Sequence, residues 1–119
     1  MPPEDRDPAY IWDMLDASRT LREFMASTTL PGYLRDRKLQ LAVERVLEII
    51  GEACLRVSPA TRSAHPEIPW HEIVGLRNFL AHQYGDIRQE RVFQVATDDI
   101  PALIASLELL VPRSPEDPG

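Results

Sequence analysis

Residues 39–57 read LQLAVERVLEIIGEACLRV, and this stretch decides the fold class of the chain. Its apolar positions alternate steps of four and three residues without a miss: Leu39, Val43, Val46, Ile50, Ala53 and Val57. Such spacing puts all six side chains on one face of an α-helix, as in a helix that packs into a core or a coiled coil. The stretch therefore predicts a long amphipathic helix that ends near Ser58 and Pro59.

A second helix is predicted before it, beginning after Asp7-Pro8, since aspartate caps helix N-termini and proline suits the first turn. Its apolar stripe also steps by three and four: Ile11, Met14, Leu15, Ser18, Leu21 and Met25. Residues 28–32, TTLPG, break this helix. Residues 58–69 contain three prolines and are predicted to form a long joint.

Two more helical regions are predicted after that joint. Pro69 opens a helix at Trp70, and Gly85 is a natural stop after it. The last region runs from about 88 to 110, with a kink or restart where Asp98-Asp99 precedes Pro101. No segment alternates as a strand would, so we expect an all-α, up-and-down bundle of four or five helices. We expect one domain over residues 1–119, with its core at about 8–111 and a flexible tail at 112–119.

The length, composition and net charge of the chain argue against several classes of protein. Thirteen Lys and Arg against nineteen Asp and Glu give a net charge of -6, which argues against broad nucleic-acid binding and leaves room for a narrow basic site. A chain of 119 residues buries only a modest core, so dimerisation would add useful burial. The single cysteine excludes an internal disulfide, and no apolar run or signal-like N-terminus is present, so we expect a cytoplasmic protein without membrane association.

The helix from Trp70 carries the candidate chemistry. At about 100° per residue, Arg77 and Tyr84 fall within the same arc as the core-facing Ile73. Asn78 and His82 lie on the opposite side, together with His71 and Gly75, where the small glycine permits close approach by another chain or a ligand. A core-facing arginine needs a partner, because an unpaired buried charge costs several kcal/mol.

Glu44, Glu48 and Glu52 form a like-charge row at intervals of four residues. One hypothesis is that Glu48 and Glu52 pair with Arg77 and orient its guanidinium. The alternative is a solvated acidic face.

Among the titratable residues, His82 is the best candidate for acid–base chemistry, because an ordinary imidazole titrates near pH 6.5. We interpret His65 and His71 as structural and Cys54 as core packing. The histidine spacing supports no metal site, and no phosphate loop, serine–histidine–acid signature or zinc motif is present, so no metal or cofactor is expected. We expect the aromatic side chains to pack in the core: Trp12, Phe24, Trp70, Phe79 and Phe93.

Arg77, His82 and Tyr84 match the Arg-x4-His-x-Tyr signature of the HepT-like toxins of the HEPN superfamily, and the chain resembles this family over residues 8–111. The resemblance extends to three further segments: VER with LEIIGEA at 43–53, IPW leading into GLRN at 68–78, and IP with Leu103 at 100–103. It implies a HEPN-like helical bundle that dimerises so that two copies of the motif face a shared cleft.

The resemblance also implies an activity: a metal-independent endoribonuclease that is the toxin of a toxin–antitoxin pair. In it His82 would assist proton transfer at the RNA 2′-hydroxyl, Arg77 would stabilise the transition state, and Asn78 would orient the substrate or the histidine. The antitoxin would be a minimal nucleotidyltransferase, MntA-like, that neutralises the toxin by transferring AMP to Tyr84. Any RNA site would be local, built from Arg77 and from Arg35, Arg37, Lys38 or Arg45.

Two other functions compete with the nuclease. The domain could be a non-catalytic helical adaptor that presents Tyr84 to a nucleotidyltransferase, or a dimeric structural module. Arg77 and His82 are about 140° apart on a regular helix, so they would not converge on one phosphate within one chain. Pairing across a two-fold axis, or unwinding near Gly85, would bring them together.

Overall fold

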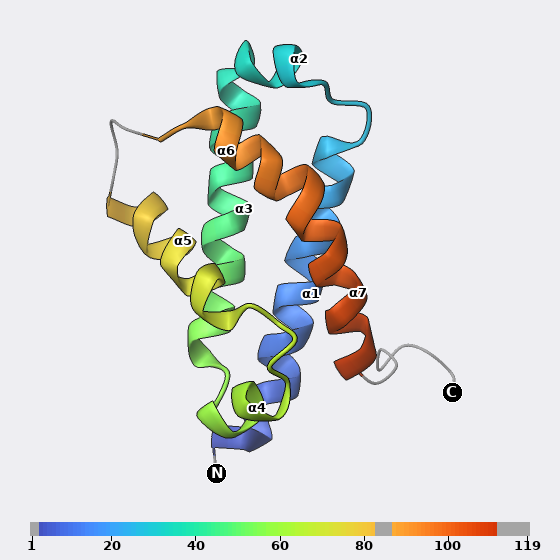
Figure 1. Ribbon diagram of the computed structural model, residues 1–119, viewed down its shortest axis with the longest axis vertical. Helices are drawn as coiled ribbons and strands as arrows, with labels where there is room; N and C mark the ends of the chain where they lie inside the picture. The colour runs from blue at the N-terminus through green and yellow to red at the C-terminus, as the bar shows by residue number, and fades with distance from the viewer. Residues whose placement is uncertain (1–2, 83–86, 112–119) are drawn as a thin grey trace.

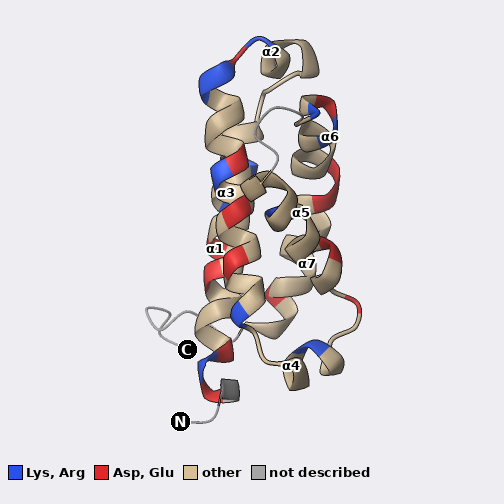
Figure 2. Ribbon diagram, turned by 90° about the vertical axis from the view of Figure 1, so that its left-hand side faces the viewer, with Lys and Arg blue, Asp and Glu red and all other residues tan. Residues whose placement is uncertain are grey.

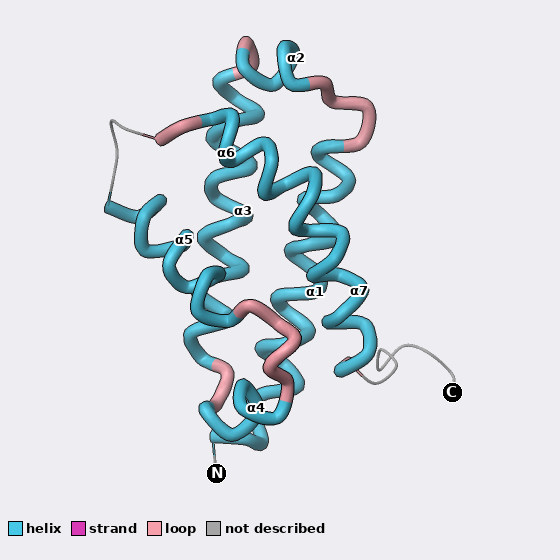
Figure 3. Tube along the Cα trace, viewed as in Figure 1, coloured by secondary structure: helices cyan, strands magenta, loops and turns pink. Residues whose placement is uncertain are grey.

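The computed structural model describes residues 3–82 and 87–111, and all regular structure in these ranges is helical (Figures 1 and 3). The elements are the 3-10 helix η1 (Pro3–Arg6), α1 (Asp7–Met25), α2 (Leu30–Leu34), α3 (Arg37–Arg56), α4 (Pro59–Ala64), α5 (Trp70–His82), α6 (Gln89–Gln94), the π-helix η2 (Val95–Asp99) and α7 (Ile100–Leu110). The predicted all-α class is confirmed. Tail residues 112–119 lie outside the described ranges, and within those ranges no helix is long and apolar enough to cross a bilayer.

The long helices alternate in direction, as expected of an up-and-down arrangement (Figure 1). The antiparallel pair α1 and α3 forms the centre, with α5 packed mainly on α3 and α7 mainly on α1. The predicted stripe of α1 is wholly buried, and that of α3 is buried except for the partly exposed Leu39. Burying these two stripes against each other is the main apolar stabilisation of the fold.

The predicted break at residues 28–32 is confirmed, since α1 ends at Met25 and a separate short helix, α2, follows. The long joint predicted at 58–69 is wrong in part, because it contains the short helix α4. Thr29 accepts a hydrogen bond from the amide of Gly32 and caps α2, while Ser58 accepts one from the amide of Thr61 and caps α4. Pro31 and Pro59 stand in the first turns, where a proline nitrogen costs no helical hydrogen bond.

The predicted restart near Asp98 is confirmed as a π-helical turn between α6 and α7. Pro101 has no amide hydrogen, and its ring crowds the carbonyl four residues earlier, so the α-helical pattern widens just before it. The turn places Asp98 and Asp99 on the surface beside α7.

Two of the five aromatic residues are not core residues, contrary to the prediction. Trp70 is buried, and Trp12 and Phe93 pack partly against the core. Phe24 is 40% exposed and Phe79 is 43% exposed, because both lie off the apolar stripes of their helices.

A polar cluster joins α2, α3 and α6, which lie near one another towards the top of Figure 1. The hydroxyl of the fully buried Tyr33 donates to Gln89 Oε1 at 2.7 Å, and Gln89 Nε2 donates to Glu44 Oε2 at 2.7 Å. Glu44 also pairs with Arg37 at 3.7 Å. Because its carboxylate is largely buried, these partners compensate its desolvation.

A second polar cluster fixes α1 to the start of α4. The buried Asp7 carboxylate accepts hydrogen bonds from the amide and hydroxyl of Ser58 and from the hydroxyl of Thr61. Burial raises the pKa of Asp7, but these hydrogen bonds and the positive charge of Arg62 outweigh it, leaving the pKa below the ordinary 3.8.

Helix α5 approaches α3 closely at Gly51. A Cβ atom on Gly51 would lie 2.2 Å from Cβ of Arg77 and 2.7 Å from its Cγ. Since no real Cβ tolerates such contacts, α5 can lie at this distance only over a glycine. The other glycine of this region, Gly75 on α5, faces open space.

Asp7→Asn should lower the free energy of unfolding by about 1–3 kcal/mol near neutral pH, because a charged acceptor of buried hydrogen bonds is lost. Because the pKa of Asp7 is lower in the folded protein than the ordinary 3.8, its ionised carboxylate stabilises the folded state fully at pH values above 3.8. This stabilisation is lost as the pH falls through the lower pKa of the folded state. Urea titrations of both proteins from neutral to acidic pH check this, with the exposed Asp13→Asn as control. A difference that persists unchanged at the acidic end would contradict the assignment.

Gly51→Ala should destabilise the fold by about 1–3 kcal/mol, because its methyl group overlaps Arg77 and forces α5 away from α3. Gly75→Ala is the matched control and should stabilise by about 0.5–1 kcal/mol, since the helical gain there meets no clash. Thermal unfolding followed by circular dichroism measures both changes. Equal shifts for the two variants would refute the close packing.

Candidate functional site

Helix α5 carries the candidate residues and is fixed at its first turn. Trp70 is buried, and its indole Nε1 donates to the carbonyl of His65 at 2.9 Å. The sulfur of Cys54 on α3 contacts the carbonyl of Trp70 at 3.6 Å. Leu80 is buried near the other end, so the helix has a defined rotation on α3.

This rotation directs Arg77 towards α3, as the helical periodicity predicts. The side chain is half-buried with its stem over Gly51, and Nη1 donates to Oδ1 of Asn78 at 3.0 Å. Its Nε is buried and has no acceptor among the described residues. An unpaired buried donor of this kind costs about 1–3 kcal/mol, and an acceptor from water, a ligand or a partner would remove that cost.

The predicted pairing of Arg77 with Glu48 and Glu52 is not present in the structure. Both carboxylates instead lie 3.5 Å from Nη1 of Arg45. Arg45 is on the same helix, three residues before Glu48 and seven before Glu52, so one guanidinium reaches both. Within the described ranges, Arg77 forms no ion pair.

Asn78 and His82 lie on the exposed side of α5, and Gly75 leaves the space beside them open. Periodicity predicts this placement, and it separates His82 from the half-buried Arg77. Tyr84 and the predicted stop at Gly85 lie outside the described residues, as does the site for AMP that the family resemblance assigns to Tyr84.

Phe79 is a surface residue that the sequence analysis assigned to the core. It is 43% exposed and lies three residues before His82, on the same side of the helix. An exposed aromatic face beside polar groups can stack on a nucleobase. Its helical position, about 120° from Ile73, was the signal that could have identified it.

The surroundings of the remaining candidate residues, Cys54, His65 and His71, give them no catalytic role. Cys54 is fully buried, and burial raises the pKa of its thiol to about 11, so it is a poor nucleophile at neutral pH. The ring of His65 lies 3.4 Å from the carboxylate of Glu67, while His71 is exposed in the first turn of α5. Within residues 3–82 and 87–111, no group of His, Cys, Asp and Glu has the arrangement of a metal site.

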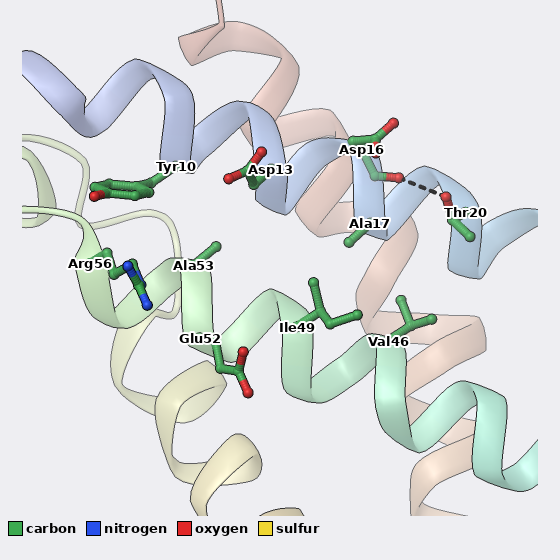
Figure 4. Close-up of a pocket in the computed structure, with 10 residues that line it drawn as sticks. All are labelled: Tyr10, Asp13, Asp16, Ala17, Thr20, Val46, Ile49, Glu52, Ala53 and Arg56. Carbon is green, nitrogen blue, oxygen red and sulfur yellow. Dashed lines mark hydrogen bonds between the residues drawn. The ribbon is translucent and has the colours of Figure 1, made fainter.

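A groove of about 450 Å³ lies between α1 and α3, and Arg77 is not among its lining residues (Figure 4). Charged side chains from both helices line the groove: Asp13 and Asp16 of α1, and Glu52 and Arg56 of α3. Ala17 and Ile49 point into the space between the two helices (Figure 4). Arg56 lies 6.0 Å from the ring centre of Tyr10. We assign no chemistry to this groove, because Arg77, Asn78 and His82 are not among its lining residues.

Comparisons with known proteins find relatives that match most of this chain. A Thermococcus cleftensis protein named "Probable ribonuclease HepT" is 36% identical over 101 residues, which cover 85% of this chain and 92% of that protein. A Methanocaldococcus jannaschii protein named "Putative RNase MJ1380" is 31% identical over 102 residues, covering 86% and 94%. No solved structure matches this chain.

The sequence profile of the family described as Ribonuclease HepT-like matches residues 14–110, which span α1 to α7. This range includes the close approach of Gly51 to Arg77 and the exposed face with His82. The resemblance stated from the motifs is therefore confirmed. The chain belongs to the HepT-like ribonuclease family.

Proposed function

We propose that this chain is a metal-independent endoribonuclease, the toxin of a toxin–antitoxin pair, whose cleavage site combines Arg77 and His82. The observation that supports the proposal is the packing and hydrogen bonding of the Arg77 side chain. Its stem packs over Gly51, Asn78 holds one end of the guanidinium, and the buried Nε lacks an acceptor among the described residues. A phosphate oxygen is the acceptor that a guanidinium fork fits best.

In the proposed reaction the RNA 2′-hydroxyl attacks the adjacent phosphorus, and neutral His82 accepts the hydroxyl proton as the O2′–P bond forms. Arg77 stabilises the added negative charge of the phosphorane-like transition state. The P–O5′ bond then breaks, and the leaving oxygen takes a proton from water. The products are a 2′,3′-cyclic phosphate and a 5′-hydroxyl.

We propose that the catalytic unit is a homodimer. Helix α5 is α-helical through His82, so the two side chains diverge by about 140°. In a two-fold dimer, Arg77 of one copy can face His82 of the other. Asn78 then acts by positioning Arg77, through its hydrogen bond at 3.0 Å.

The surroundings favour a local RNA site within an acidic protein. Arg45 is engaged by Glu48 and Glu52, and Arg37 by Glu44, so these two are weaker candidates for phosphate contacts. The exposed residues Arg35 and Lys38 lie at the α2–α3 end, where Figure 2 shows the basic part of α3. Phe79 offers a stacking surface for a base beside His82.

We propose that a minimal nucleotidyltransferase, MntA-like, controls this activity through Tyr84, in the reaction that the family resemblance implies. The tyrosine oxygen attacks the α-phosphorus of ATP, pyrophosphate leaves, and the phenolic proton is released. Tyr84 follows His82 by two residues in the sequence. The added negative charge near the site would repel RNA phosphate.

Purified wild-type protein should cleave RNA in the presence of EDTA, and Arg77→Ala and His82→Ala should each slow cleavage by about 100-fold or more. His71→Ala is the matched control, an exposed histidine on the same helix, and should cut at the wild-type rate. Denaturing gels of labelled RNA give the rates. Cleavage that persists in both variants, or inactive unmodified wild type, would reject the nuclease and leave the adaptor function.

Incubation with ATP, Mg²⁺ and a purified minimal nucleotidyltransferase should add whole adenylyl masses to the wild type and abolish its cleavage of RNA. Tyr84→Phe should remain unmodified, while Tyr10→Phe should be modified as the wild type is. Intact-mass spectrometry reads the result. An adenylyl mass retained by Tyr84→Phe would disprove the assignment.

A further inference from the structure

A second groove, larger than the first at about 500 Å³, lies between α5 and the segment formed by η2 and α7. Glu72, Ile73 and Leu76 of α5 line one side, and η2 with the first turns of α7 lines the other. Leu47 and Ile50 of α3 form its base. The groove therefore lies over α3, between α5 on one side and η2 with α7 on the other (Figure 1). Arg77, Asn78 and His82 are not part of it.

The floor of this groove is apolar and continuous with the core. Ile73 and Leu76 are half-buried, so part of each side chain faces the open groove. Behind them lie buried core residues: Leu47, Ile50, Val95, Ile100 and Leu103. A long apolar floor between two helices suits the i, i+3, i+4 and i+7 side chains of another helix.

The rim of the groove is acidic. Four carboxylates surround the floor, from Glu67, Glu72, Asp98 and Asp99, against one lining cation, Arg91. Arg91 donates to Gln94 at 3.1 Å, and within the described ranges neither Glu72, Asp98 nor Asp99 is in an ion pair. Two of these charges belong to consecutive residues, Asp98 and Asp99, at the end of the π-helical turn.

We propose that this groove binds an amphipathic helix of a second protein, with leucine-like residues on one face and lysine or arginine at its borders. The apolar floor and the acidic rim together favour this occupant, because the rim carboxylates would repel RNA phosphate. The site is independent of the proposed nuclease residues, because Arg77, Asn78 and His82 do not line it.

A direct test uses a fluorescein-labelled helical peptide with leucines at the i, i+3, i+4 and i+7 spacing and lysines elsewhere. Fluorescence anisotropy should show binding to the wild type and none for the same peptide with glutamates in place of the lysines. The triple variant Glu72→Gln, Asp98→Asn, Asp99→Asn should bind about tenfold more weakly. Ala102→Arg, at an exposed position in the groove wall, should also bind more weakly.

The matched control is Asp13→Asn, Asp16→Asn, Glu23→Gln, which removes the same charge from exposed positions of α1. It should bind the peptide as the wild type does, and the groove variants should retain wild-type melting and RNA cleavage. Equal weakening in the control, or no binding by the wild type, overturns the proposal. Groove variants that instead lose RNA binding, or that change the oligomeric state in sedimentation velocity, would assign the groove to RNA or to a second copy.

Discussion

The close approach of α5 to α3 at Gly51 is the constraint on which the rest of the site depends. Because no side chain intervenes, the stem of Arg77 packs directly on the backbone of α3, and its guanidinium is half-buried. This contact sets the rotation of α5. It turns Asn78, Phe79 and His82 outward on one side and leaves Leu76 over the acidic groove on the other.

Most of the fold could be predicted from the sequence, because the spacing of apolar residues along a long amphipathic helix indicates which face is buried. The stripes of α1 and α3 and the interruption before Pro101 follow from elementary helix geometry. The short helices α2 and α4 could not, since prolines that indicate a loop also suit a first helical turn. Phe79 was assigned to the core from its residue type, although its helical position places it outside.

The candidate site was less predictable because it depends on tertiary contacts. Periodicity places Arg77 inward, but only the structure identifies Gly51 as the surface beneath it and Asn78 as its hydrogen-bond partner. The glutamate row made Glu48 and Glu52 reasonable partners for Arg77. Arg45 reaches both of them along the same helix, and single-helix geometry could have indicated this competition. Glu44 is instead used to join α3 to α6.

The central claim is that Arg77 of one copy acts with His82 of another. Mixing inactive Arg77→Ala with inactive His82→Ala, after dissociation and reassociation, tests it directly through the rate of RNA cleavage. A composite site predicts recovery to about a quarter of the wild-type rate, because half of the dimers are mixed and each has one intact site. A mixture as inactive as either variant alone would contradict the account.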